Sequence, residues 1–89
     1  MPTEEGSESG IGIIVWANII RKHAREFAVV VTAVASESDE TVGVTDLEMM
    51  RCSTLQEAEA QREVLIQAVQ DAVRSRGDRV LRTEMLPAS

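Results

Sequence analysis

The chain has 89 residues, one cysteine and a formal net charge of −6. Its length predicts one domain with a thin core, because a chain this small buries only about 60–65% of its unfolded surface. The acidic balance argues against a sequence-independent grip on nucleic-acid phosphates, which needs a clustered positive face.

The compartment follows from the cysteine count and the N-terminus. A single cysteine excludes an internal disulfide, and an acidic N-terminus is unlike a secretory signal, so we expect a cytoplasmic protein. The longest apolar runs, residues 11–20 and 27–35, are about half of a membrane span, which argues against a membrane protein.

Residues 1–10, MPTEEGSESG, are rich in Glu, Ser and Gly. They lack apolar side chains that would anchor them after Met1, so they predict a disordered acidic tail. Residues 11–86 are then a single α+β domain, and residues 87–89 form a C-terminal tail.

Two apolar segments predict the centre of a sheet. Residues 11–20, IGIIVWANII, are dense in β-branched side chains and apolar at both parities, as in a strand buried on both faces. Helical spacing across residues 13–24 leaves a helix open as the alternative. Residues 26–35, EFAVVVTAVA, alternate without a polar face and predict a second, central strand.

A polar connection, residues 36–40, leads to a third strand over residues 41–50, TVGVTDLEMM. The connection has a length suited to a β-hairpin. The apolar parity switches along the third strand, from Val42 and Val44 to Leu47 and Met49. A β-bulge near Thr45 and Asp46 would explain the switch.

Residues 53–77 predict an amphipathic helix. Ser53 or Thr54 can cap it, since Gln56 and Glu57 follow each at capping-box spacing, and Gly77 can end it. The predicted apolar stripe is Leu55, Ala58, Leu65, Ile66, Val69, Ala72 and Val73. Arg62 interrupts this stripe, either with its methylenes over apolar surface and its guanidinium in water, or in a buried pair with a carboxylate.

Residues 78–86 alternate as a half-exposed fourth strand, which Pro87 ends. The sequence therefore predicts an α+β fold of order β-β-β-α-β. The first three strands form an antiparallel meander, and one long helix packs on one face of the sheet. This helix is the crossover, expected to be right-handed, that leads to a last strand parallel to the third.

No nucleophile, base and orienting group come together in the sequence, so we expect no catalytic residue and no enzyme. Asp39, Glu40, Asp46 and Glu48 near the hairpin are read as solvated charges, so we expect no metal site. Cys52 is read as a small buried hydrophobe, although Arg51 and the helix terminus offer a way to lower its pKa.

His23 lies in a polar connection with no adjacent acid to orient it. Gly10 and Gly12 fail the dinucleotide fingerprint, because Val15 stands where its third glycine belongs, and we expect no cofactor. Basic residues cluster loosely in two segments of the sequence. Together they could form an edge rich in arginine, which we call the arginine edge, that binds phosphates or an acidic partner. The two basic groups comprise Arg21, Lys22 and Arg25, then Arg74, Arg76, Arg79 and Arg82.

Residues 27–73 resemble the HicB-type antitoxins. The resemblance is carried by the hairpin, the VTDL segment at residues 44–47, Cys52, and TLQEA at residues 54–58. It implies a partly degraded ribonuclease-H-like fold that binds a small toxin. The chain departs from that pattern, since it lacks a glycine pair at the hairpin tip and a Pro-Gly after Leu47.

Three functions follow from these observations. The first is a non-enzymatic homodimer that acts in protein–protein interaction and has Trp16, Val30 and Val34 in the interface, on the sheet face without a helix or along an edge strand. The second is a HicB-like antitoxin or nucleic-acid-associated regulator with a small toxin partner. The third is an acid-cluster hydrolase.

Overall fold

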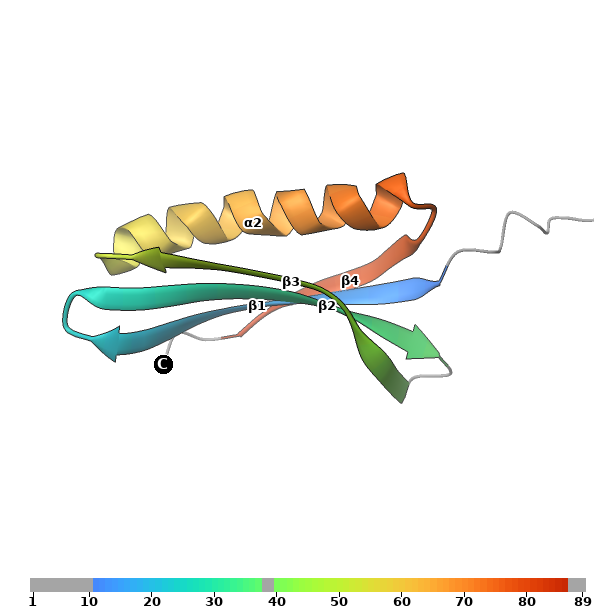
Figure 1. Cartoon of the computed structure of the whole chain (residues 1–89), viewed down its shortest axis with the longest axis horizontal. Coiled ribbons are helices and arrows are strands. Elements are labelled where there is room, and N and C mark those ends of the chain that lie inside the picture. The colour runs from blue at the N-terminus through green and yellow to red at the C-terminus, as the bar shows by residue number, and fades with distance from the viewer. Residues whose placement is uncertain (1–10, 38–39, 87–89) are drawn as a thin grey trace, which may run out of the picture.

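The computed structural model describes residues 11–37 and 40–86. The predicted tails, residues 1–10 and 87–89, lie outside the described residues. The elements in chain order are β1 (Gly12–His23), β2 (Glu26–Glu37), β3 (Glu40–Cys52), α2 (Leu55–Ser75) and β4 (Arg79–Met85). The predicted α+β class and element order are confirmed (Figure 1), and the helical alternative for residues 13–24 is wrong.

The four strands form one sheet in the order β3-β2-β1-β4. β1 and β2 pair antiparallel, as do β2 and β3, whereas β4 pairs parallel with β1. β4 therefore runs in the direction of β3, as predicted, but it adds beside β1 at the far side of the sheet. β1 and β2 are central, which explains why both carry apolar side chains at both parities.

β3 contains the predicted bulge. Its pairing with β2 shifts between Ala33, opposite Asp46, and Val34, opposite Val44, so Thr45 is the extra residue. A second shift leaves Val42 unpaired. The bulge at Thr45 returns Val44 to the face that carries Leu47, which accounts for the parity switch in the sequence.

α2 begins and ends with the motifs that the sequence indicates. Thr54 is the N-cap: its hydroxyl accepts from the Glu57 backbone N–H at 3.0 Å, and the Glu57 carboxylate accepts from the Ser53 N–H at 2.9 Å. At the other end Gly77 adopts φ 92°, and its N–H donates to the Arg74 carbonyl. The chain thus turns sharply from α2 into β4.

The core lies between α2 and one face of the sheet, as the side view shows (Figure 1). From α2 it takes Ala58, Leu65, Ile66, Val69 and Val73, and from the central strands Ile13, Val15, Ala17, Ile19, Phe27, Val29, Val31 and Ala33. Leu55 and Ala72, predicted in the stripe, are exposed at its margins. No helix in the described part of the chain is long and apolar enough to cross a membrane.

Arg62 fits the first of its two alternatives only in part. Its side chain is half-buried, its Nε is buried without a hydrogen-bond partner, and the ion pairs among the described residues do not include it. A buried pair with a carboxylate is therefore wrong for the described residues, and the side chain stays partly exposed although its Nε is not in water.

Candidate functional site

The face of the sheet opposite α2 has no covering element among the described residues, and we call it the uncovered face. Strand registers assign its members, since directly paired residues point to the same side of a sheet. They are Ile14, Trp16, Asn18 and Ile20 from β1, Ala28, Val30, Thr32 and Val34 from β2, Val44, Leu47, Met49 and Arg51 from β3, and Arg82 and Glu84 from β4. Its centre is apolar apart from Asn18 and Thr32, and charged side chains border it: Arg51 at one end of β3, and Arg82 and Glu84 along β4.

The structure places all three predicted interface residues on the uncovered face. Trp16 pairs with Thr32, Val30 with Asn18 and Val34 with Ile14. Trp16 and Val30 are half-buried, so both retain surface for a contact. Val34 is only 2% exposed in the single chain and adds little area.

β3 supplies the most exposed part of the uncovered face. The side chains of Val44, Leu47 and Met49 are 62–65% exposed. They lie beside the central strands, since Val34, Thr32 and Val30 are their direct partners in β2. The sequence analysis named these three residues for the parity switch but did not assign them to the interface, although the bulge that explains the switch places them on one face.

Trp16 also leaves a polar atom without a partner. Its indole Nε1 is buried and makes no hydrogen bond within the described part of the chain. A buried donor without an acceptor costs about 1–3 kcal/mol, so this site lowers the stability of the single chain.

The uncovered face has the outline of a stable contact, although part of it is already buried in the single chain. β1, β2 and β3 have 12, 12 and 13 residues, and at about 3.3 Å per residue and 4.8 Å between strands they span about 600–700 Å² with part of β4. Stable interfaces bury about 600–1,000 Å² on each partner. Ile14, Ala28 and Val34 are only 1–4% exposed in the single chain, so the surface left for a contact lies mainly on Trp16, Val30 and the exposed side chains of β3.

A polar cluster ties three elements together at the far end of α2. The Arg76 guanidinium contacts Asp46 Oδ2 at 2.6 Å and Asp78 Oδ2 at 2.8 Å, and Asp78 Oδ1 accepts from the Ile11 N–H at 2.9 Å. The Arg76 hydrogen bond holds the pKa of Asp46 below its ordinary value. The Ile11 N–H, then Arg76, lower the pKa of Asp78. These carboxylates are ionised partners of Arg76 that hold the sheet to α2.

The predicted acidic residues separate in the structure. Asp46 is paired with Arg76, and Glu48 is exposed. Asp39 and the Glu40 side chain lie outside the described residues. Within residues 11–37 and 40–86, no three His, Cys, Asp or Glu side chains converge on a metal position.

Cys52 and His23 do not form a reactive pair. Cys52 is 6% exposed within the core, and burial, with a smaller contribution from the Glu57 charge, raises the pKa of its thiol. The lowered pKa considered from the sequence is therefore wrong. His23 has an exposed side chain, 3.9 Å from Glu26 Oε1, which corrects the expectation that no acid lies beside it.

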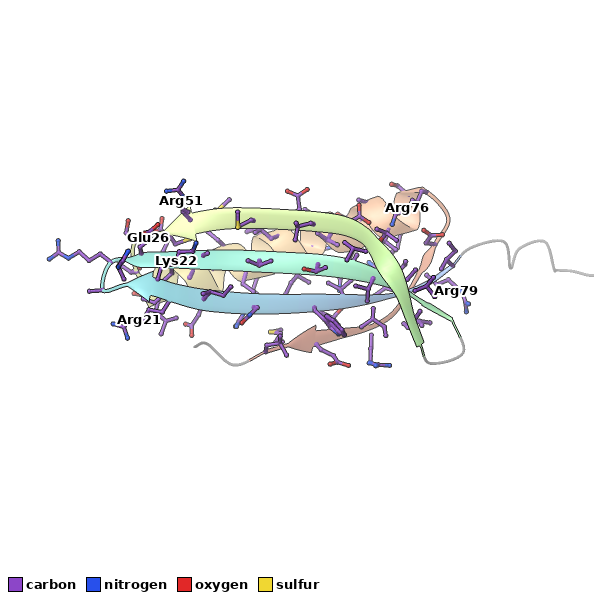
Figure 2. The ribbon with its side chains drawn as sticks, turned by 60° about the horizontal axis from the view of Figure 1, so that its bottom comes forward. Arg21, Lys22, Glu26, Arg51, Arg76 and Arg79 are labelled. Carbon is purple, nitrogen blue, oxygen red and sulfur yellow. The ribbon has the colours of Figure 1, made fainter. Side chains whose placement is uncertain are left out.

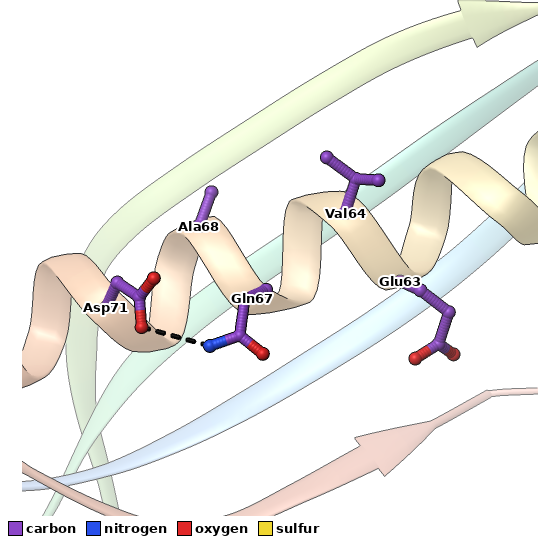
Figure 3. Close-up of a pocket in the computed structure, with 5 residues that line it drawn as sticks. All are labelled: Glu63, Val64, Gln67, Ala68 and Asp71. Atoms are coloured by element: carbon purple, nitrogen blue, oxygen red, sulfur yellow. Dashed lines mark hydrogen bonds between the residues drawn. The ribbon is translucent and has the colours of Figure 1, made fainter.

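The outer surface of α2 carries a shallow hollow (Figure 3). Glu63, Val64, Gln67, Ala68 and Asp71 line it, and the Gln67 amide donates to Asp71 at 3.0 Å. All five residues come from one helix, so the hollow has no opposing wall. It lacks the enclosing geometry of a small-molecule site.

The two basic groups lie at opposite ends of the sheet (Figure 2). Arg21 and Lys22 lie near Glu26 and Arg51 at one end, and Arg76 and Arg79 at the other. At that second end Arg76 is engaged by Asp46 and Asp78. The groups therefore do not form one continuous arginine edge.

Comparison of the chain with protein-family models, curated proteins and solved structures found no match. The resemblance to the HicB-type antitoxins accordingly rests on the sequence segments that carry it.

Proposed function

We propose that the protein is a non-enzymatic, cytoplasmic interaction domain that works as a homodimer and associates through the uncovered face. The single observation that carries this proposal is the apolar surface that runs from Trp16 and Val30 to Leu47 and Met49. Soluble proteins seldom leave such a surface exposed.

A two-fold contact is the simplest way to cover this surface. The same patch on two copies is self-complementary, and sheets pack face to face at about 10 Å with interdigitating side chains. Leu47 and Met49 would extend the thin core of each chain.

The second candidate, a HicB-like antitoxin or nucleic-acid-associated regulator, gains no comparable support. A phosphate-binding role would be favoured by one outward-facing basic surface, whereas the basic groups lie at two ends and Arg76 is in ion pairs. A hydrolase would need carboxylates that converge within a pocket, and Asp46 is paired with Arg76 instead.

Sedimentation equilibrium across micromolar concentrations tests the homodimer. We expect the wild type to dimerise, and Val30→Glu and Met49→Glu each to weaken the dimer by about a hundredfold or more, because each buries an unpaired charge. Met49 is 65% exposed in the single chain, so Met49→Glu leaves the fold intact even where Val30→Glu does not.

Val64→Glu is the matched control, since Val64 is 57% exposed on the opposite side of the molecule, on the outer surface of α2. It should dimerise as the wild type does. A wild type that stays monomeric at high micromolar concentration, or a Met49→Glu variant that dimerises like Val64→Glu, contradicts the proposal.

A further inference from the structure

β3 is the outer strand on one side of the sheet (Figure 2), and no strand pairs with its outer side within residues 11–37 and 40–86. From Asp46 to Cys52 it pairs with β2 without a register shift. We call this stretch of seven residues, 46–52, the free edge. A regular strand with an unpaired side is a template for pairing with another chain.

The backbone of the free edge presents hydrogen-bonding groups to a neighbour. The Thr45 hydroxyl donates to the Ala33 carbonyl, so the backbone of Ala33 faces β3. Backbone groups alternate in direction along a strand, so the odd-numbered residues of β2 bond to their even-numbered partners in the free edge. The N–H and C=O groups of the odd-numbered residues Leu47, Met49 and Arg51 therefore point away from the sheet.

The same three residues carry exposed side chains on the uncovered face. Leu47 is 62% and Met49 65% exposed, whereas Ile14 and Val34, nearer the middle of the sheet, are buried. In the single chain, the most accessible apolar side chains therefore lie at the margin of the sheet. A contact through the face of one sheet surrounds side chains at its centre better than side chains at its margin.

The opposite edge of the sheet differs in each of these respects. β4 has seven residues, and its pairing with β1 shifts at Leu81. Arg79, Arg82 and Glu84 lie along it. Short length, a bulge and charged side chains are the features that keep an edge strand from pairing with another chain. Of the two described edges, β3 is therefore the one suited to strand pairing.

We propose that the free edges of two copies pair antiparallel, so that two four-stranded sheets become one sheet of eight strands. A two-fold axis perpendicular to the sheet relates the copies, which puts both uncovered faces on one side and both α2 helices on the other. Leu47 and Met49 of each copy then lie at the centre of a continuous apolar face. The inference goes beyond the proposed homodimer, because it adds a second contact between copies, which we call the edge contact.

Side-chain chemistry selects the register of the edge contact. With Met49 on the two-fold axis, all seven residues of the free edge are paired, because Met49 is the midpoint of residues 46–52. Glu48 then lies opposite the partner's Met50. With Glu48 on the axis instead, two carboxylates would lie directly opposite each other, which destabilises a pair of strands. The register centred on Met49 is therefore favoured.

The edge contact is compatible with a contact through the uncovered face. The axis of the edge contact is perpendicular to the sheet, whereas the axis of the face contact lies parallel to it, between the two packed sheets. Perpendicular two-fold axes that intersect close a tetramer. In that tetramer two sheets of eight strands meet through their uncovered faces, and the α2 helices lie outside.

Engineered cysteines test the edge contact and its register. Opposite residues of a hydrogen-bonded antiparallel pair have Cα atoms about 5.5 Å apart, within the range of a disulfide, whereas sheets packed face to face are about 10 Å apart. Met49→Cys should therefore form a disulfide-linked dimer in a glutathione redox buffer at micromolar protein concentration. A non-reducing gel separates the linked from the unlinked chains.

Leu47→Cys is the matched control, since the two copies of residue 47 lie about 13 Å apart along the strands in this register. It should stay unlinked alone and should link when mixed with Arg51→Cys, because these two positions lie opposite each other. The wild type, whose Cys52 is only 6% exposed, should also stay unlinked.

A proline substitution separates the two contacts in solution. Arg51→Pro removes an N–H that points outward, so pairing with β2 is kept while the ring blocks a strand at the free edge. Arg51→Ala keeps that N–H and is the matched control. By sedimentation equilibrium at high micromolar concentration we expect a tetramer for the wild type and Arg51→Ala. We expect a dimer for Arg51→Pro, through the face, and a dimer for Val30→Glu, through the free edge.

The outcomes separate this inference from the proposed homodimer. Met49→Cys that stays unlinked, or that links no faster than Leu47→Cys, overturns the edge contact and leaves the face contact standing. Arg51→Pro that assembles as Arg51→Ala does overturns the edge contact as well. Linkage of Met49→Cys, with assembly that Arg51→Pro abolishes and Val30→Glu leaves unchanged, supports the edge contact and overturns the contact through the uncovered face.

Discussion

Replacement of Val31 by Ala tests the assignment of the two sheet faces. Val31 is fully buried in the core beneath α2, whereas Val30, the preceding residue of β2, lies half-buried on the uncovered face. The two side chains are identical and adjacent, so Val30→Ala is the matched control.

The expected magnitude follows from the burial. Val31→Ala removes two buried methyl groups, about 1.6 kcal/mol of transfer free energy, and the cavity left behind raises the loss to about 2–3 kcal/mol. A domain of this size has a free energy of unfolding of about 5–10 kcal/mol. The melting temperature should therefore fall by about 8–20 °C. Val30→Ala should cost below about 1 kcal/mol in the monomer.

Urea unfolding followed by circular dichroism, at concentrations where the chain is monomeric, measures both changes, and an unchanged m-value confirms that only stability has moved. At higher concentration a second copy that binds the folded wild type stabilises it by mass action. Val30→Ala should weaken this binding, so its apparent stability relative to the wild type should fall further at high concentration than in the monomer. Equal losses for Val30→Ala and Val31→Ala in the monomer would refute the assignment of faces.

Three further substitutions probe single contacts, each by the same urea assay. Gly77→Ala should lower the free energy of unfolding by about 1 kcal/mol, because φ 92° strains any side chain, while Gly43→Ala, which meets open space, should not be destabilising. Thr54→Ala should cost about 1 kcal/mol through loss of the N-cap, and Ser53→Ala, which keeps the backbone N–H used by the cap, should be near neutral; equal effects would contradict the capping assignment. The carboxylates paired with Arg76 have lowered pKa values, so their stabilisation is complete above about pH 4 and is lost as pH falls through the folded pKa values. Arg76→Gln should accordingly be destabilised at pH 7, and its difference from the wild type should shrink as pH falls below about 4; a difference that is the same at pH 7 and at the lowest pH where both chains fold would argue against the ion pairs.

Residue periodicity by itself indicated the helix and the strands that follow residue 25, and it left residues 13–24 open between strand and helix. The caps at Thr54 and Gly77 and the bulge at Thr45 were also readable, because each depends on neighbouring residues along the chain. The helical alternative for residues 13–24 was the main ambiguity. Pairing of β1 with both β2 and β4 resolves it, since a helix could not supply those backbone hydrogen bonds.

The tertiary structure alone decided how the elements meet. Sequence order does not say that β4 adds beside β1, nor that β3 is consequently left as an outer strand with Leu47 and Met49 exposed. The predicted contact residue Val34 proved to be buried already, because its exposure depends on neighbours in both adjacent strands. The Arg76 and Asp46 pair joins positions 30 residues apart, and only the register of the bulged strand against the end of α2 brings such distant charges within 2.6 Å.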